Sequence, residues 1–185
     1  MDREALGAAL REHAYLEGDF VLRSGRRSRY YLDKYRFETQ PEVLASLGEL
    51  IAETVREHDA AAARLAGPEL GAVALAAAAS LASGLPFLIV RKQAKDYGTA
   101  NRLEGVFEAG ERVCLVEDVV TSAGAAIEAV EGLREAGLEV ETAVCVVDRE
   151  EGGAAALEGA GVRLWPLFLA SELLSRAKSA AKPHG

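Results

Sequence analysis

The feature that most constrains the fold is a regular alternation of apolar, strand-like runs with helical segments from residue 64 onward. The runs LIV, CLV and AVCVV are continuously apolar, as expected of strands buried on both faces. Repeated strand–helix–strand units predict an α/β fold with a mainly parallel sheet covered by helices on both faces. We expect strands near residues 64–66, 86–91, 112–117, 140–147 and 162–167, and helices near 71–83, 123–136, 152–159 and 171–178.

The N-terminal part of the chain has a different pattern. Apolar residues at helical spacing predict a short amphipathic helix over residues 2–16 and a longer one over 42–57. Between them, two β-rich pieces flank a Ser-Gly turn and predict a small hairpin-like unit over residues 20–34. We expect all 185 residues to form one domain, because the chain is too short for two domains of ordinary size.

Composition excludes several classes of protein. The formal net charge of −8 disfavours a nucleic-acid or anionic-membrane surface. Residues 70–90 carry no charge, but the run is rich in Ala and broken at SGLP, so we interpret it as a buried helix, a turn and a buried strand. Cys114 and Cys145 lie in apolar runs typical of buried thiols in a reduced protein, and no Cys/His cluster has zinc spacing. The charged N-terminus lacks an apolar signal core, so we expect a cytoplasmic protein without membrane or nucleic-acid partners.

Ligands of such sheets bind beyond the carboxyl ends of the strands, so the candidate site segments are 67–71, 91–103, 117–124 and 148–153. The third segment, within VEDVVTSAGAAI, has two adjacent acids before a turn of small residues that opens a helix. Small residues let backbone N–H groups approach an anion, and the helix N-terminus favours negative charge. The turn alone is weak evidence, because helix N-caps use the same residue types.

The two acids, Glu117 and Asp118, sharpen the prediction. Carboxylates accept hydrogen bonds, and alcohols are the neutral donors they usually meet in a ligand. The turn can therefore hold the phosphate of a sugar phosphate while the acids accept from its ribose hydroxyls. The same acids can stabilise positive charge that develops on the sugar ring when a bond at its anomeric carbon breaks. The alternative is an incidental strand–turn–helix junction with two solvated acids.

An apolar strand, Glu-Asp, two apolar residues and Thr-Ser-Ala-Gly resemble the phosphoribosyl diphosphate (PRPP) motif of type I phosphoribosyltransferases. Other segments resemble the orotate phosphoribosyltransferases in particular. RKQAKDYG is similar to their flexible cationic loop, and FVLRSGRRSRYYLDKY to the N-terminal hood that covers the base. CVVDREEGG is similar to the segment whose arginine binds the orotate carboxylate, and AGPELGAVAL to the turn that binds diphosphate through backbone amides. Without the PRPP motif, the loop would be interpreted as solvated and the arginine as an ordinary surface residue.

The resemblance implies the type I phosphoribosyltransferase fold, an α/β fold with a central, mainly parallel sheet flanked by helices and a small N-terminal hood. The single domain would have a hood of roughly residues 1–36 plus a C-terminal segment, and a core of roughly residues 41–169. The implied activity is the Mg²⁺-dependent transfer of the 5-phosphoribosyl group from PRPP to orotate, which yields orotidine 5'-monophosphate and diphosphate in pyrimidine biosynthesis. The resemblance also implies a homodimer with shared active sites.

The resemblance assigns roles to individual residues, and Lys92, Lys95 and Asp118 would be catalytic. The residues expected to bind PRPP are Arg91, Lys92, Lys95, Tyr97, Glu117, Asp118, Val119, Val120, Thr121, Ser122, Ala123, Gly124 and Ala125. The residues expected to bind orotate are Arg23, Tyr30, Tyr31, Thr121 and Arg149. No residue is expected to be a metal ligand, because Mg²⁺ keeps water and substrate oxygens in its coordination shell.

The sequence departs from the family pattern at three places. Tyr97 stands where the family commonly has histidine, and tyrosine carries no positive charge at neutral pH. The AGPELGAVAL turn lacks the lysine that some relatives carry, and Ala123 replaces a glycine. Two alternatives stay open: a type I enzyme that acts on a purine base, and a non-catalytic regulator that senses PRPP. The loop and hood patterns count against the first, and the acidic charge counts against the second.

Overall fold

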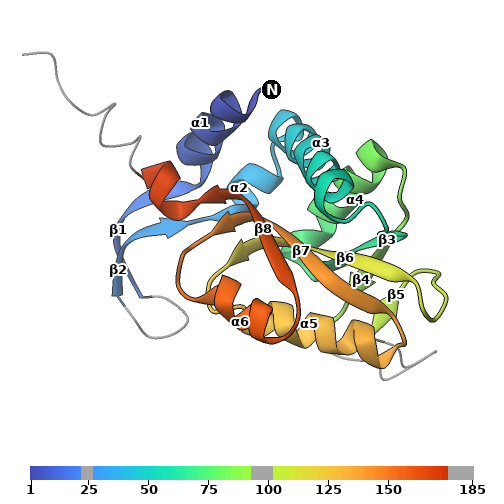
Figure 1. Ribbon diagram of the computed structural model, residues 1–185. Helices are drawn as coiled ribbons and strands as arrows, with labels where there is room; N and C mark the ends of the chain where they lie inside the picture. Colours follow the sequence, from blue (N-terminus) through green and yellow to red (C-terminus); the bar gives the residue numbers. More distant parts are fainter. Residues whose placement is uncertain (22–26, 93–101, 175–185) are drawn as a thin grey trace, which may run out of the picture.

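A computed structural model describes residues 1–21, 27–92 and 102–174 of the chain (Figure 1). Its main feature is a six-stranded sheet with the strand order β5-β4-β3-β6-β7-β8. The strands are β3 (Arg64–Pro68), β4 (Phe87–Val90), β5 (Leu103–Glu104), β6 (Arg112–Val120), β7 (Glu139–Asp148) and β8 (Arg163–Leu169). All neighbouring strands are parallel except β4 and β5, which are antiparallel. The predicted α/β fold with a mainly parallel sheet is therefore confirmed.

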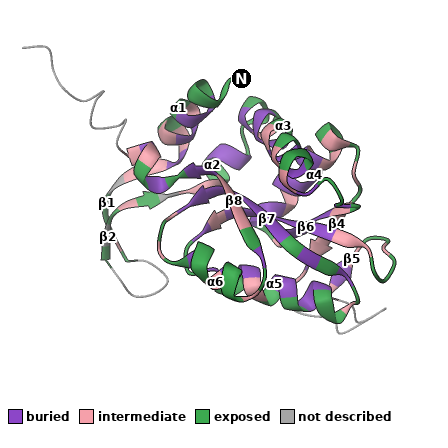
Figure 2. Cartoon of the chain, in the orientation of Figure 1, coloured by how far each residue is buried: buried purple, intermediate pink, exposed green. Residues whose placement is uncertain are grey.

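Helices cover both faces of the sheet (Figure 1). On one face lie α1 (Arg3–Ala14), α3 (Pro41–His58) and α4 (Gly71–Ser83), and on the other lie α5 (Gly124–Glu135) and α6 (Gly153–Gly159). Successive residues of a strand point to opposite faces, so β6 contributes Cys114 and Val116 to one core and Val113 and Leu115 to the other. Figure 2 shows the buried residues concentrated along the sheet and the inner faces of the helices.

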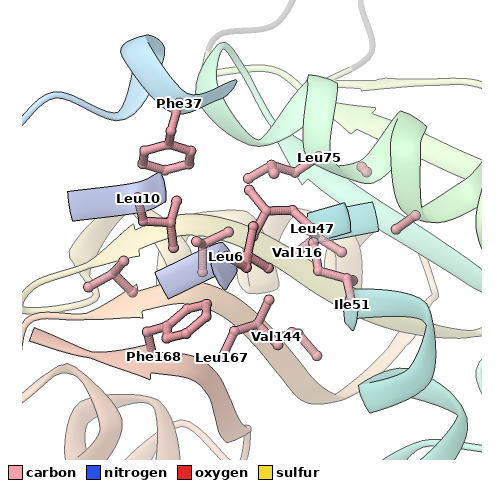
Figure 3. Close-up of a cluster of buried hydrophobic side chains, with 14 of the residues drawn as sticks. Leu6, Leu10, Phe37, Leu47, Ile51, Leu75, Val116, Val144, Leu167 and Phe168 are labelled. Atoms are coloured by element: carbon pink, nitrogen blue, oxygen red, sulfur yellow. The ribbon is translucent and has the colours of Figure 1, made fainter. Parts of the chain in front are cut away.

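The core on the α1, α3 and α4 side is the larger of the two buried clusters. Figure 3 shows Leu6, Leu47 and Leu75, which come from three different helices, converging over Val116 and Val144 of the sheet. All five side chains are at most 1 % exposed. A side chain of this size stabilises a fold by about 2 kcal/mol when it is fully buried. This core fixes α4 relative to β6, and both elements contribute to the site described below.

The N-terminal segment forms a small separate layer. β1 (Tyr15–Val21) and β2 (Arg27–Leu32) pair antiparallel, and the short helix α2 (Lys34–Glu38) follows them. The Asp2 side chain caps α1 by accepting a hydrogen bond from the N–H of Ala5 at 2.8 Å. Arg3 donates to the carbonyl oxygen of Leu167 and pairs with Glu172, both at 2.8 Å. The two Arg3 contacts hold α1 against β8 and the residues that follow it.

Most expected elements are confirmed, and α4 spans the predicted range of 71–83. Gly84 ends α4 in the left-handed conformation (φ 77°), and the uncharged run continues as β4, as predicted. No helix within the described ranges has both the length and the apolarity needed to cross a bilayer. Of the predicted helix over 171–178, residues 171–174 are helical and the remainder lies outside the described residues.

Two elements were not predicted, the end of β6 was placed too early, and the hairpin, expected from residue 20, begins at Tyr15 because its first strand directly follows α1. The short elements α2 and β5 were not predicted, because so few residues carry no periodic pattern. β6 was expected to end at residue 117 but continues to Val120. Val119 and Val120 still pair with Val147 and Asp148 of β7, and this pairing extends the strand. The two acids consequently lie inside the strand instead of at its end.

Candidate active site

An open cavity of about 200 Å³ lies at the carboxyl ends of β3 and β6. It is bordered by α2, the β3–α4 turn, Lys92 after β4, the end of β6 and the β6–α5 turn. The lining residues are Lys34, Tyr35, Pro68, Glu69, Leu70, Gly71, Lys92, Glu117, Asp118, Val119, Val120, Thr121, Ala123, Gly124, Ala125 and Ala126. Three of the four predicted site segments therefore meet in one cavity, and the fourth, 148–153, does not line it.

Two helices begin at this cavity, α4 at Gly71 and α5 at Gly124. Their N-cap residues are Leu70 and Ala123, whose side chains have no polar atom that could accept a hydrogen bond from the first-turn N–H groups. The first N–H groups of a helix have no partner within the helix, and they carry partial positive charge. The cavity therefore presents two backbone cradles for anionic groups such as phosphates.

Ala123 occupies the left-handed backbone conformation, with φ 64°. This conformation costs a non-glycine residue on the order of 1 kcal/mol. The methyl group of Ala123 is, however, only 5 % exposed and packs into the core on the α5 side. Burial of one methyl group contributes about 0.8 kcal/mol, which nearly offsets the backbone cost. The replacement of the family's glycine by Ala123 is therefore a mild change.

The two acids of β6 are almost completely buried: Asp118 is 4 % exposed and Glu117 is 8 % exposed. Asp118 Oδ1 accepts a hydrogen bond from the N–H of Val119 at 2.5 Å. Asp118 Oδ2 forms an ion pair with the ammonium group of Lys34, which comes from α2. Lys34 was not among the predicted site residues, because no spacing rule connects residue 34 with residue 118. The nearest signal was its position directly after the hood pattern, in the string YLDKY.

A third buried carboxyl group, that of Glu38, lies near this pair and is 5 % exposed. Burial, and then the negative charge of Asp118, raise the pKa of Glu38 to about 8. The same two causes raise the pKa of Glu117 to about 8. Burial lowers the pKa of Lys34, but the charge of Asp118 and its hydrogen bond outweigh this effect, so the pKa is raised. Lys34 thus stays charged at the centre of an acidic cluster.

Two of the predicted orotate-binding residues, Thr121 and Arg149, follow the ends of the paired strands β6 and β7, and Thr121 lines the cavity. Val120 and Asp148 form the last residue pair of β6 and β7, and Thr121 and Arg149 are the residues that follow them. The N–H of Arg149 donates to the carbonyl oxygen of Val120 at 2.9 Å. The Arg149 guanidinium lies 5.0 Å from the ring of Tyr30 and pairs with Glu151 at 3.1 Å. A buried arginine beside an aromatic ring suits a flat ligand that carries a carboxylate.

Comparisons with known proteins agree with this geometry. The model of the phosphoribosyl transferase domain family matches residues 35–160. The orotate phosphoribosyltransferase of Methanocella arvoryzae is 51 % identical over 174 residues, which cover 94 % of this chain and 98 % of that protein. The chain belongs to the orotate phosphoribosyltransferase family. 

Solved structures of orotate phosphoribosyltransferases have the same fold. The Aeropyrum pernix enzyme matches with a TM-score of 0.83 and 32 % identity, covering 97 % of this chain and 99 % of that chain. The Mycobacterium tuberculosis H37Rv enzyme, solved in complex with PRPP, matches with a TM-score of 0.79 and 31 % identity, covering 94 % and 99 %. The predicted family and the type I phosphoribosyltransferase fold are therefore confirmed.

Within this orotate phosphoribosyltransferase fold, most of the expected PRPP-binding residues line the cavity. Ser122 and Arg91 are not among the lining residues, and the Arg91 guanidinium pairs with Glu104 of β5 at 3.5 Å. Tyr30 and Arg149 lie together, whereas Tyr31 is 43 % exposed and packs against Phe20 with ring centroids 5.6 Å apart. The expected roles of Arg23, Lys95 and Tyr97 fall on residues outside the described ranges.

We expect Glu38→Gln to reduce the loss of stability that the protein undergoes as the pH rises. The folded protein binds the Glu38 proton more tightly than the unfolded chain does, because the pKa is about 8 instead of 4.5. This contribution is present below the unfolded pKa and is lost as the pH rises through the folded pKa. Denaturant titrations give the free energy of unfolding at about pH 5 and about pH 9. The decrease between these two pH values should be smaller in Glu38→Gln than in the wild type by on the order of 1–3 kcal/mol.

The matched control for this experiment is Glu42→Gln, which changes an exposed glutamate in the first turn of α3. The control should have the same pH dependence of unfolding as the wild type. Identical pH dependence in Glu38→Gln and the wild type would contradict the raised pKa of Glu38.

Proposed function

We propose that this chain is an orotate phosphoribosyltransferase that transfers the 5-phosphoribosyl group from PRPP to orotate, giving orotidine 5'-monophosphate and diphosphate. The observation that carries the proposal is the side-by-side placement of Thr121 and Arg149 at the ends of paired strands. This placement brings the phosphate turn next to an arginine and tyrosine pair that suits an aromatic carboxylate. The close relationship to enzymes of that name over nearly the whole chain supports the same reaction in pyrimidine biosynthesis.

The geometry supports a division of labour within the cavity. The turn from Thr121 and the N-terminus of α5 would hold the 5'-phosphate, and the turn at Gly71 with the N-terminus of α4 would hold the diphosphate. Asp118 and Glu117 would accept hydrogen bonds from the ribose hydroxyls. As the bond to the leaving diphosphate lengthens, positive charge develops at the anomeric carbon, and the buried carboxylate of Asp118 would stabilise it. Orotate would attack from the side of Arg149.

Mg²⁺ fits this cavity as an ion that arrives with PRPP. The two oxygens of Asp118 already contact Lys34 and the N–H of Val119, so direct metal ligation by this carboxylate would compete with both. Hard oxygen ligands from the substrate and from water match the preference of Mg²⁺, and the acids can accept hydrogen bonds from those waters. When bound, the ion would offset the negative charge of the leaving diphosphate.

Base specificity tests the proposed activity directly. The purified protein is incubated with PRPP, Mg²⁺ and orotate, uracil, adenine or hypoxanthine, and consumption of each base is followed by absorbance. We expect rapid loss of orotate alone. Loss of a purine base instead would favour a type I enzyme of different specificity, and PRPP binding without turnover of any base would favour the regulator.

We also propose that the enzyme is a homodimer in the cytoplasm. An apolar groove of about 550 Å³ runs between α3 and α4, and Leu81 at its edge is 89 % exposed. Such an exposed apolar face is typical of a protein interface. The same helix begins at the cavity, where Leu70 is 70 % exposed, so a second copy on this face would also adjoin the active site. The free, buried thiols of Cys114 and Cys145 are consistent with a reducing compartment.

We expect Leu81→Asp to dissociate the dimer, because it places a charge in the apolar face between two copies. Sedimentation velocity at micromolar protein should show a monomer, with a matching fall in the rate of orotate consumption. The control is Val106→Asp, which changes another apolar residue that is 81 % exposed but does not line this groove. A Leu81→Asp protein that sediments like the wild type would contradict this assignment of the interface.

A further inference from the structure

Lys34 joins three segments that are distant in the sequence. Its ammonium group pairs with Asp118 Oδ2 of β6 and lies 2.7 Å from the point that a Cβ atom on Gly71 would occupy. It comes from α2, which directly follows the N-terminal hairpin. The hood, the diphosphate turn and the PRPP motif therefore meet at this one ammonium group, which also lines the cavity.

The contact leaves Asp118 able to bind substrate. A carboxylate can accept about four hydrogen bonds, two at each oxygen. Asp118 receives one at Oδ1 from the N–H of Val119 and one at Oδ2 from Lys34, so each oxygen keeps capacity for a ribose hydroxyl. The two bonds hold the carboxyl group from two sides, which fixes its rotation before any ligand arrives.

The surroundings of the pair explain why a cation is needed there. Glu38 and Glu117, like Asp118, are less than a tenth exposed, so three carboxyl groups lie buried around one ammonium group. Buried carboxyl groups do not attract one another, so the ammonium group of Lys34 offers Asp118 an attractive partner that fixes the direction of its carboxylate. The other described cation that lines the cavity is Lys92, whose backbone N–H donates to Glu69 Oε1 at 2.8 Å.

We infer that Lys34 is a positioning residue for phosphoribosyl transfer, which holds the Asp118 carboxylate in the orientation that faces the ribose. This inference rests on the proposed function for the role of Asp118. Lys34 acts through Asp118, so its removal impairs the use of PRPP more than the use of orotate.

The test is a double-mutant cycle with Lys34→Met and Asp118→Asn. Lys34→Met keeps the length of the side chain and removes its charge. We expect it to raise KM for PRPP by about 10- to 100-fold. Affinity typically falls by this factor when a group that orients a ligand-binding side chain is removed. KM for orotate should change less than about twofold. In the Asp118→Asn background, Lys34→Met should raise KM for PRPP by less than about a further threefold, because the effects of coupled residues are not additive.

Two further variants separate a positioning role from a purely structural one. Lys34→Arg retains the charge and should recover most of the affinity for PRPP. Arg36→Met changes an exposed cation on the same helix and should leave both KM values unchanged. Equal effects of Lys34→Met in the wild-type and Asp118→Asn backgrounds would overturn the inference, as would a lower thermal midpoint with unchanged KM.

PRPP binding measured by calorimetry without orotate keeps this inference separable from the proposed reaction. If the wild type fails to consume orotate, the proposed function fails, but Lys34→Met must still weaken PRPP binding. If the wild type consumes orotate and Lys34→Met binds PRPP as tightly as the wild type, the proposed function stands and the role of Lys34 is wrong.

Discussion

Gly71→Ala should abolish most of the PRPP-dependent activity, with a fall in kcat/KM for PRPP of about 10²-fold or more. The Cβ atom of an alanine at this position would overlap Asp118 Oδ2 and lie 2.7 Å from Lys34 Nζ. The backbone of Asp118 belongs to the buried strand β6 and cannot move away. The carboxyl group must therefore rotate away from Lys34 and the cavity. The variant therefore disturbs the acid, its partner cation and the diphosphate turn together.

Steady-state kinetics with varied PRPP measure this effect, and thermal unfolding monitors the fold. The matched control is Gly48→Ala, because a Cβ atom there would also collide, lying 2.7 Å from the backbone of Ala78 where α3 packs on α4. Gly48→Ala should lower the thermal midpoint without a selective effect on PRPP. If Gly71→Ala keeps kcat/KM for PRPP within a factor of about three of the wild type, the arrangement of Gly71, Lys34 and Asp118 is wrong.

Asp118→Asn should lower kcat/KM for PRPP by about 10²- to 10³-fold with little loss of stability. The amide oxygen can still accept from the N–H of Val119, so the local hydrogen bonding survives. The charge that would stabilise the developing cation is lost. Stability changes little because the charge of Asp118 raises the pKa values of Glu38 and Glu117. When that charge is removed, these two pKa values fall, and a neighbouring carboxylate can replace Asp118 as the counter-ion of Lys34.

Asp59→Asn provides the comparison at the opposite end of the same strand. Asp59 is 3 % exposed and pairs with Arg112, the first residue of β6, at 2.5 Å. Loss of this charge-assisted hydrogen bond should cost about 2 kcal/mol in the free energy of unfolding and leave kcat/KM near the wild-type value. A large drop in thermal midpoint with intact kinetics in Asp118→Asn would instead assign Asp118 a structural role.

The fold could be predicted from the sequence because its signals are local and repeated. Continuous apolar runs such as AVCVV mark parallel strands, and the ends of α4 follow from Gly71 and the Ser-Gly-Leu-Pro break. The PRPP motif was found for the same reason, since its acids and small residues are consecutive. The short elements α2 and β5 carry too few residues for any pattern, and their existence depends on what they pack against.

The sequence by itself determined the parallel sheet, the order of its main helices, the family and three of the segments that form the cavity. Only the tertiary structure decided which side chains meet there. Lys34 reaches Asp118 across 84 positions of sequence, and Arg91 turns to Glu104 although it stands beside Lys92 in the cationic segment. The physical reason is that the periodicity of a strand or helix depends on residues that are close in the sequence, whereas the partner of a charged side chain depends on how the elements pack in space.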